Sequence, residues 1–409
     1  MTRWTHVMMT TAAGLIMGCH QPKAAAAEPA DPRPVQALAV AEENEALSGA
    51  PQARPEDSPE PKRLLRPEDL KGLAWRSVGP ANMGGRVAAI AVAPGNPRTF
   101  FIGYGTGGLF KTTNGGTTFT PVFDKEGTAS IGAVAVADAP PDWPGWVDEA
   151  AVGTAGEESD PATKGKAKIV WVGTGEGNGR NSSSWGDGVY RSIDGGATFK
   201  NVGLRETHDI PRLAVDPRNP DVCYVAAMGH LWGPNLGRGL YKTSDAGKTW
   251  QAILQVDELT GCCDVVLDPQ TPDTVYAAMY TRLRQAHSFQ SGGPNGGIFR
   301  SDDGGATFKK LTTGLPPETG RIGLDVVLKD PRIIHASVES DAGGRTMDAW
   351  HNYSKAGGVF RSEDRGETWA RMSILTPRAF YFSRIRVDPK NDHRVYLPGW
   401  GLGVSDDGG

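Results

Sequence analysis

The chain has 409 residues and a nearly balanced charge, with 43 Lys and Arg against 47 Asp and Glu. It carries no basic run or stripe, which excludes the electrostatic footprint expected of a nucleic-acid-binding protein. Its 54 glycines and 30 prolines follow no collagen period, and this is typical of an all-β protein with many turns.

The N-terminus has the features of an export signal. Arg3 supplies a positive charge, and the mostly apolar stretch 7–17 is too short to span a membrane as a mature helix. The run LIMGC at 15–19 resembles a bacterial lipobox, in which the cysteine is lipidated. We therefore predict a lipoprotein-type signal peptide over 1–19 with Cys19 as the lipidation site; a plain secretory signal cut elsewhere is the alternative. The residue after the cysteine is not Asp, which favours the outer membrane.

Residues 20–70 are rich in Pro, Ala and Glu and contain no aromatic residue. Such a stretch cannot offset its ordering entropy by burying apolar surface, so we predict a disordered tether. The remaining cysteines, Cys223, Cys262 and Cys263, have neither a disulfide framework nor a metal-ligand spacing. We predict no metal and no cofactor from the sequence.

Beyond the tether, one phrase recurs: Ser/Thr-x-Asp-x-Gly-x-Thr-Phe/Trp. Five full copies are present, and a sixth begins where the chain ends; they are TTNGGTTF (112–119), SIDGGATF (192–199), TSDAGKTW (243–250), SDDGGATF (301–308), SEDRGETW (362–369) and SDDGG (405–409). The residues at the third position are Asn114, Asp194, Asp245, Asp303, Asp364 and Asp407. Repeats of this kind decide the fold class.

The surroundings of each copy predict strands. A short apolar run that opens with Gly precedes it, as GVYR does at 188–191, and a strand starting at the aromatic follows. Upstream lie two β-branched runs joined by a tight Asp-Pro turn, as in LAVDPRNPDVCYVAA at 213–227. Each repeat is therefore strand A, turn, strand B, variable loop, strand C, Asp turn, strand D. We predict an all-β β-propeller of four-stranded antiparallel blades over 71–409, with five full blades and part of a sixth, incomplete at the C-terminus.

The repeated Asp turn is explained without a ligand. Its carboxylate can accept hydrogen bonds from turn amides, and its glycine supplies a positive φ at little cost. A calcium loop would need several oxygen ligands and a closing Glu, which no copy provides. We predict a structural role for these turns.

The turns resemble the Asp-box, or bacterial neuraminidase (BNR), repeats shared by sialidases, xyloglucanase-type glycoside hydrolases and the sortilin-type propeller. The runs SVGPANMGGRVAAIAV (77–92), WVGTGEGNGRNSSSWGDGVYRS (171–192) and AAMGHLWGPN (226–235) resemble a group of bacterial secreted proteins. These are sortilin-like or glycosyl-hydrolase-like repeat proteins, and the resemblance covers 72–409 and only their N-terminal part.

The strand order predicts where a ligand would bind. In an A–B–C–D meander, the A–B and C–D turns share one face and the B–C loops share the other. The varied segments 174–187, 228–238, 281–296 and 339–356 are B–C loops, and loop variation on a rigid scaffold commonly carries binding. The richest loop supplies the candidates Glu176, Asn178, Arg180, Asn181, Trp185 and Asp187. Its glycines imitate a phosphate loop, but no Lys-Ser/Thr follows them.

Neighbouring segments add further candidates. They are His230, Trp232, Arg282 and Arg284 on the loops, and Arg86 and Arg212 at the starts of inner strands. Two alternatives stay open for the arginines: they converge on a channel mouth and bind an anion, or they pair with acidic neighbours. The pair His208-Asp209 is expected to be a contact of the link between blades.

Two functions follow. The first is an exported binding module for a peptide, protein or glycan, held to the membrane only by its lipid anchor. The alternative is a glycoside hydrolase with non-standard residues, Glu176 and Asp187 acting as the acid/base pair. The resemblance predicts a xyloglucanase-type catalytic Asp in the first blade, where GYGTGGLFK (103–111) has Gly105. It predicts a sialidase Arg-Ile-Pro motif where this chain has Arg86-Val87-Ala88.

Overall fold

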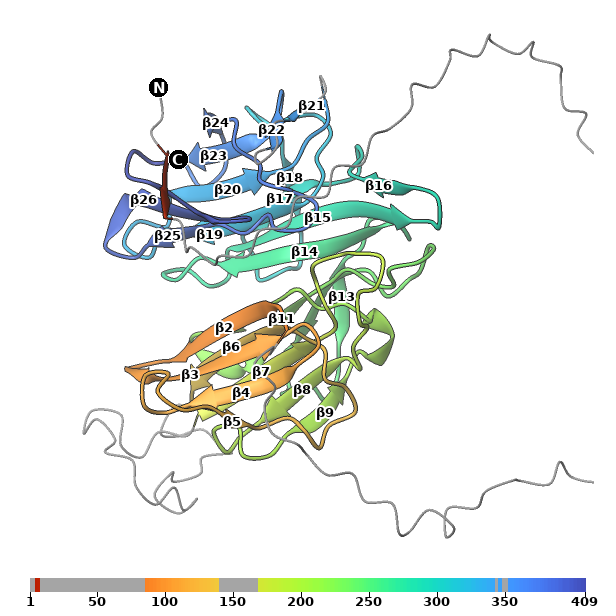
Figure 1. Cartoon of the computed structure of the whole chain (residues 1–409), viewed down its shortest axis with the longest axis vertical. Coiled ribbons are helices and arrows are strands. Elements are labelled where there is room, and N and C mark those ends of the chain that lie inside the picture. Colours follow the sequence, from red (N-terminus) through yellow and green to blue (C-terminus); the bar gives the residue numbers. More distant parts are fainter. Residues whose placement is uncertain (1–3, 8–84, 140–167, 343–344, 348–351) are drawn as a thin grey trace, which may run out of the picture. The chain divides into compact units, whose positions relative to one another are not determined.

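The computed structural model describes residues 4–7, 85–139, 168–342, 345–347 and 352–409 (Figure 1). These residues belong to one compact unit, which comprises residues 1–9 and 80–409. Apart from Trp4–Val7, the predicted signal peptide with Cys19 and the predicted tether lie outside the described residues. Within the described ranges, no helix combines the length and the hydropathy needed to cross a bilayer.

The described chain folds into six antiparallel sheets, each with a path of four strands, together with one two-stranded sheet. The first two blades are β2 (Val87–Ala93), β3 (Asn96–Tyr104), β4 (Gly108–Thr112) and β5 (Thr120–Pro121), then β6 (Ile131–Asp138), β7 (Lys168–Thr174), β8 (Val189–Ser192) and β9 (Lys200–Gly203). The third is β10 (Arg212–Asp216), β11 (Asn219–Ala227), β12 (Gly239–Thr243) and β13 (Gln251–Leu254). The predicted β-propeller of four-stranded blades is confirmed.

The remaining blades keep the same order. The fourth is β14 (Thr260–Leu267), β15 (Val275–Arg284), β17 (Gly297–Ser301) and β18 (Lys309–Leu311), with β16 (Phe289–Ser291) paired to β15 beyond the blade. The fifth is β19 (Ile322–Val326), β20 (Ile334–Val338), β23 (Gly358–Ser362) and β24 (Ala370–Ser373); β21 (Arg345–Met347) and β22 (Asn352–Ser354) form the separate hairpin in its B–C segment. The inner strands pack in sequence, β2 on β6, β6 on β10, β10 on β14, β14 on β19 and β19 on β25.

The sixth blade differs from the expected partial one. It consists of β25 (Arg386–Asp388), β26 (Asn391–Pro398) and β27 (Leu402–Ser405), and its fourth strand is β1 (Trp4–Val7), which pairs antiparallel with β27. β1 lies inside the stretch predicted to be an export signal. Cleavage after Gly18 would remove this strand from the mature chain, and the signal stays a prediction.

The core lies between neighbouring blades. Trp171 on β7 is fully buried, packs edge-on against Trp250 at a centroid distance of 6.3 Å, and donates from Nε1 to the Pro220 carbonyl at 3.0 Å. Cys223 on β11 belongs to the same cluster, as expected for a small core residue. The three described cysteines are buried and free, and burial raises the pKa of the Cys223 thiol.

The repeated Asp turns share one hydrogen-bond pattern between strands C and D. In the fourth blade Ser301 accepts from the Gly305 amide at 2.8 Å and donates to Asp303 at 2.7 Å. The Asp303 carboxylate accepts from the Thr307 amide at 2.9 Å and from its hydroxyl at 2.6 Å. The corresponding acceptors in the other full copies are Asn114, Asp194, Asp245 and Asp364. These bonds close the turn from within.

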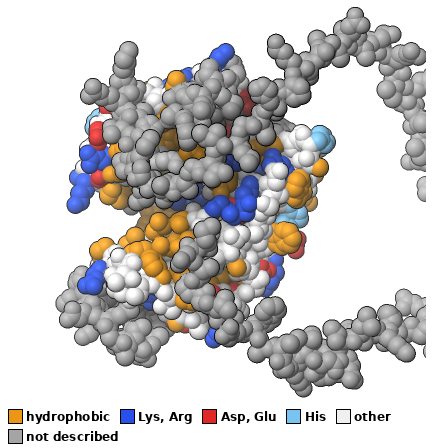
Figure 2. Space-filling model, viewed as in Figure 1, with side chains coloured by type: hydrophobic (Ala, Val, Ile, Leu, Met, Phe, Trp, Pro, Cys, Tyr) orange, Lys and Arg blue, Asp and Glu red, His pale blue; other side chains and the backbone are white. Residues whose placement is uncertain are grey.

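Hydrophobic side chains gather over β2 in Figure 2. Val87, Ile90 and Val92 on this inner strand of the first blade are exposed. Ile90 and Val92 alternate with less exposed neighbours, as residues on the two faces of a strand do, and a register shift separates them from Val87.

Candidate functional site on the B–C loop face

The B–C loop face is defined here by the segments that join strands B and C: 175–188, 228–238, 285–296, 339–357 and 399–401. Segment 175–188 is held by its own backbone. The Glu176 amide donates to the Ser184 carbonyl at 2.9 Å, and the Arg180 amide donates to the Ser183 hydroxyl at 2.8 Å. The Gly175 amide donates to the Ser130 carbonyl at 2.9 Å, which ties the loop to the start of the blade. These hydrogen bonds therefore fix the conformation of the loop.

Glu176 is the second residue of this loop and is only 2% exposed. Arg86 from the first blade donates to its two carboxylate oxygens from Nε and Nη2, at 2.7 and 2.8 Å. Arg180 donates to the same carboxylate at 3.4 Å. A bidentate guanidinium pair of this kind is strong and fixes the orientation of the carboxylate.

Gly105 faces this carboxylate. A Cβ atom added at Gly105 would lie 3.3 Å from the Glu176 carboxyl carbon and 3.4 Å from Nη2 of Arg86. The Glu176 carboxyl group of the second blade therefore lies against Gly105 of the first blade.

Asp187, the other half of the hypothetical acid/base pair, is engaged by its own blade and the following link. Tyr190 donates its hydroxyl to Asp187 Oδ2 at 2.6 Å, and the Asn201 amide group donates to the same oxygen at 3.3 Å. Arg205 forms an ion pair with the other carboxylate oxygen. Through these three partners, Asp187 holds the loop against β8 and β9.

Three arginines of the candidate set, Arg86, Arg212 and Arg282, pair with acidic groups. Arg86 pairs with Glu176, and Arg212 lies 3.4 Å from the buried Asp264. Arg282 is fully buried and donates from Nη2 to Asp209 Oδ2 at 3.1 Å.

Asp209 itself is buried. Burial raises the pKa of Asp209 to about 6, and the Arg282 guanidinium opposes part of that rise. The Asp209 contact is thus an ion pair between the blade link and β15.

Two further contacts join distant parts of the face. Asn178 Oδ1 accepts from Arg321 Nη2 at 2.9 Å, although the two residues are 143 positions apart. Arg284 stacks over the Phe289 ring, with its guanidinium carbon 4.6 Å from the ring centroid, and its backbone bridges to Trp232. Asn181 is exposed. Asn178 therefore joins the B–C segment of the second blade to the residue before β19, and the B–C segment of the third blade meets the end of β15.

Among the described residues, three tryptophans are strongly exposed, and all three lie on this face. They are Trp185 (69%), Trp232 (49%) and Trp400 (68%). Trp400 was missed by sequence reasoning, because its segment lies in the blade expected to be incomplete. Arg378 stacks over the Trp400 ring at 5.3 Å and over the Tyr381 ring at 4.9 Å.

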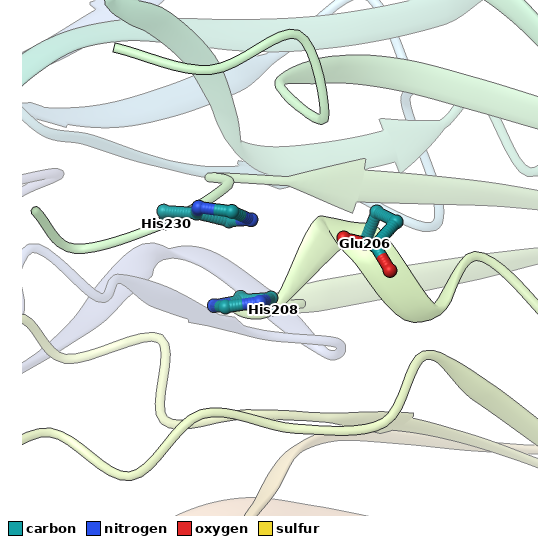
Figure 3. A group of neighbouring side chains, drawn as sticks. All are labelled: Glu206, His208 and His230. Atoms are coloured by element: carbon teal, nitrogen blue, oxygen red, sulfur yellow. The ribbon is translucent and has the colours of Figure 1, made fainter. Parts of the chain in front are cut away.

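A histidine pair lies beside Trp185. His208 stacks on His230 with ring centroids 3.6 Å apart and planes 23° apart (Figure 3). Trp185 stacks on His208 with ring centroids 6.2 Å apart. His208 has φ 51° and ψ −60°, a backbone conformation that non-glycine residues rarely adopt. Burial, with the neighbouring His230, lowers the pKa of His208. The sequence signal for this pair, His208 beside a strand start and His230 in GHLWG, lies in two separate repeats.

The fold and the B–C loop face define an all-β six-bladed propeller with exposed aromatic residues on one end. Similar proteins are found among xyloglucanases. The chain is 26% identical over 275 residues to xyloglucanase Xgh74A of Acetivibrio thermocellus, which covers 62% of this chain and 29% of that protein. It is 28% identical over 275 residues to a xyloglucanase of Hypocrea jecorina, with 63% and 30% covered. No protein-family model matches the chain.

Among solved structures, the GH74 enzyme of Niastella koreensis matches with a TM-score of 0.50 and 22% identity, over 78% of this chain and 45% of that one. This likeness shows the β-propeller fold. The chain spans less than a third of the length of the two curated relatives named above, 29% and 30%.

Proposed function

We propose that this propeller is the glycan-binding part of a xyloglucanase-type glycoside hydrolase. The observation that carries the proposal is the similarity to bacterial and fungal xyloglucanases over about 60% of the chain, 62% and 63% in the two comparisons above. It favours the hydrolase alternative over a binding module for a peptide or protein.

The chemistry of the B–C loop face supports a glycan ligand. Exposed Trp185, Trp232 and Trp400 offer large apolar ring faces with a polar N–H edge, and sugar rings present apolar faces flanked by hydroxyl groups. Sites that orient small ligands combine such aromatic walls with a few fixed polar groups. Asn181, exposed beside the loop's glycines, and the partly exposed Arg180 supply such groups.

Glu176 is the carboxyl group that we assign to the reaction. It supplies a carboxylate beside Gly105, and the fork of Arg86 holds it in one orientation. Glycosidases need one carboxylate and one proton-donating carboxyl group on either side of the bond that breaks. A carboxylate that accepts from two guanidinium groups suits the first role. The resemblance places the second carboxyl group in a further propeller, so binding and turnover are tested separately.

Xyloglucan binding by the purified chain tests the proposal. Isothermal titration with xyloglucan oligosaccharides should give at least about fivefold weaker binding for Trp185→Ala or Trp232→Ala, because a stacked ring contributes roughly 1 kcal/mol beyond its buried area. Leu236→Ala on the same face and Phe119→Ala at the opposite end remove exposed apolar groups other than the three tryptophans. These controls should bind as the wild type does. Equal affinity for all variants would exclude this face, and binding of peptides without binding of glycans would restore the binding-module hypothesis.

Release of reducing ends from xyloglucan tests Glu176. Glu176→Gln keeps the shape of the side chain, so any turnover that the wild type shows should be lost while oligosaccharide affinity changes little. Unfolding curves of this variant control for the lost ion pair with Arg86. Turnover that survives the substitution would exclude Glu176, and binding without turnover by the wild type would limit this chain to glycan binding.

We also propose that the repeated turns are Asp-box turns and that the chain is exported. The shared bonds of Asp303 and its counterparts support the first. A polymeric glycan lies outside the cell membrane, so a protein that binds it must be exported. The predicted signal peptide and Cys19 as a lipid anchor agree with this.

A further inference from the structure

Glu206, His208 and His230 form a cluster of metal-ligand side chains that the proposed function does not use. Each offers one ligand atom, and the three atoms lie within 4.8 Å of one another. Glu206 belongs to the short turn η3 (Arg205–Thr207), His208 follows it, and His230 lies near the start of the B–C segment of the third blade. We propose that these three side chains bind one divalent transition-metal ion of the Zn²⁺ or Cu²⁺ type.

The backbone of the cluster is fixed on both sides. The Thr207 amide and hydroxyl both donate to the Leu204 carbonyl, at 3.1 and 2.7 Å, and close the turn. The His208 carbonyl accepts from the Gly186 amide at 2.8 Å, which holds its positive φ in place. Metal sites need ligands that the fold brings together before the ion arrives.

Arginines from the third and fourth blades hold the backbone of His230 in the same way. Its carbonyl accepts from Arg238 at 3.0 Å and from Arg282 at 3.4 Å, and both arginines are buried. The imidazole itself is only partly buried, like that of His208, and Glu206 is exposed. The backbones are therefore set, and the side chains can still turn.

Metal binding requires one of the two imidazole rings to rotate. The two imidazole rings lie almost parallel, one above the other, with Glu206 to one side (Figure 3). A metal ion binds a ring nitrogen in the plane of the ring at about 2.0–2.1 Å, so it cannot serve two rings stacked face to face. Binding must rotate at least one ring out of the stack. Because Trp185 packs on His208, the rotation changes the surroundings of that indole.

The donor set selects the ion. Two imidazoles and a carboxylate suit Zn²⁺, Cu²⁺ and similar ions, whereas Ca²⁺ and Mg²⁺ prefer oxygen ligands alone. Three protein ligands leave a coordination position for water or another small ligand. The site does not include Glu176, so it stands or falls independently of the proposed hydrolase.

Metal titration of the tag-free chain tests the proposal. Isothermal titration with Zn²⁺ should show one site, and His208→Ala and His230→Ala should each weaken it at least tenfold, with Glu206→Gln weakening it less. His287→Ala, which removes an exposed histidine elsewhere on the same face, should leave affinity unchanged. With Cu²⁺, paramagnetic resonance should show two coordinated nitrogens.

Trp185 provides a second measurement. Ring rotation should change indole fluorescence on Zn²⁺ binding, and Trp185→Phe should abolish that change while keeping the affinity. Unfolding curves identify any variant that fails to fold. If His230→Ala fails to fold, His230→Gln is measured in its place. The proposal is overturned if Zn²⁺ does not bind at micromolar concentration, if His208→Ala binds as the wild type does, or if Ca²⁺ binds in its place.

Discussion

At the repeated turn of the fourth blade, we expect the buried Ser301 hydroxyl to contribute more to stability than the exposed Asp303 carboxylate does. Ser301 is buried and accepts from the Gly305 amide at 2.8 Å, whereas Asp303 is reached by solvent. Removing the hydroxyl in Ser301→Ala leaves a buried amide without its acceptor, which costs about 1–3 kcal/mol. Urea unfolding of this variant should therefore show a clear loss of stability.

Asp303→Asn is the matched comparison at the same turn. In the first blade Asn114 already accepts from the Thr118 amide at 2.9 Å and donates to its hydroxyl at 2.9 Å. The amide can thus replace the carboxylate, and we expect a smaller change than in Ser301→Ala. The bonds from Thr307 hold the pKa of Asp303 well below its usual value, so the carboxylate stays charged in mild acid. An Asn variant less stable than the Ala variant would show that the charge matters more than the serine bond.

At the scale of one element, strand β20 carries a histidine that makes stability depend on pH. His335 is fully buried, and burial together with Arg361 lowers the pKa of His335 from 6.5 to about 4. Arg361 lies 3.3 Å from its Nε2 and also pairs with Asp392. The unfolded chain binds a proton on this histidine below pH 6.5, and the folded chain does not.

Stability should therefore be full above pH 6.5 and fall as pH drops toward 4, by about 3 kcal/mol from this group alone. The free energy of unfolding measured by urea at several pH values checks this, and His335→Gln should lose less stability over the same range. His287→Gln, at an exposed histidine, should keep the wild-type slope. A slope that His335→Gln leaves intact would assign the pH dependence to other groups.

The elements themselves are largely predictable from the sequence. Each blade carries its turn chemistry in a local phrase, so SDDGGATF places the end of β17 and the start of β18 without knowledge of the rest of the chain. The site is not local in this sense. Asn178 meets Arg321 across 143 positions, and His208 meets His230 from two different blade segments. Trp400 lies in a blade whose fourth strand comes from the other end of the chain, which no repeat predicts.

At the scale of the whole molecule, glycines set how closely the blades approach one another. The second residue of strand A is Gly132 in the second blade, Gly261 in the fourth and Gly323 in the fifth. A Cβ at Gly132 would lie 2.3 Å from the Ile210 carbonyl oxygen, and one at Gly323 would lie 2.1 Å from that of Ser383. Both oxygens belong to the link that leads to the next blade, and backbone cannot move aside as a flexible side chain can.

Gly132→Ala and Gly323→Ala should therefore force adjacent blades apart and destabilise the propeller by about 1–3 kcal/mol or more. Gly401→Ala is the matched control, because its added Cβ meets nothing within 4 Å and its φ is not in the left-handed region. It should change stability by less than about 0.5 kcal/mol. Thermal and urea unfolding of the three variants measure the difference. If the two inner-strand variants unfold at the same temperature and urea concentration as the wild type, the inner strands are packed loosely enough to accommodate a methyl group. Glycine then does not set the spacing of the blades.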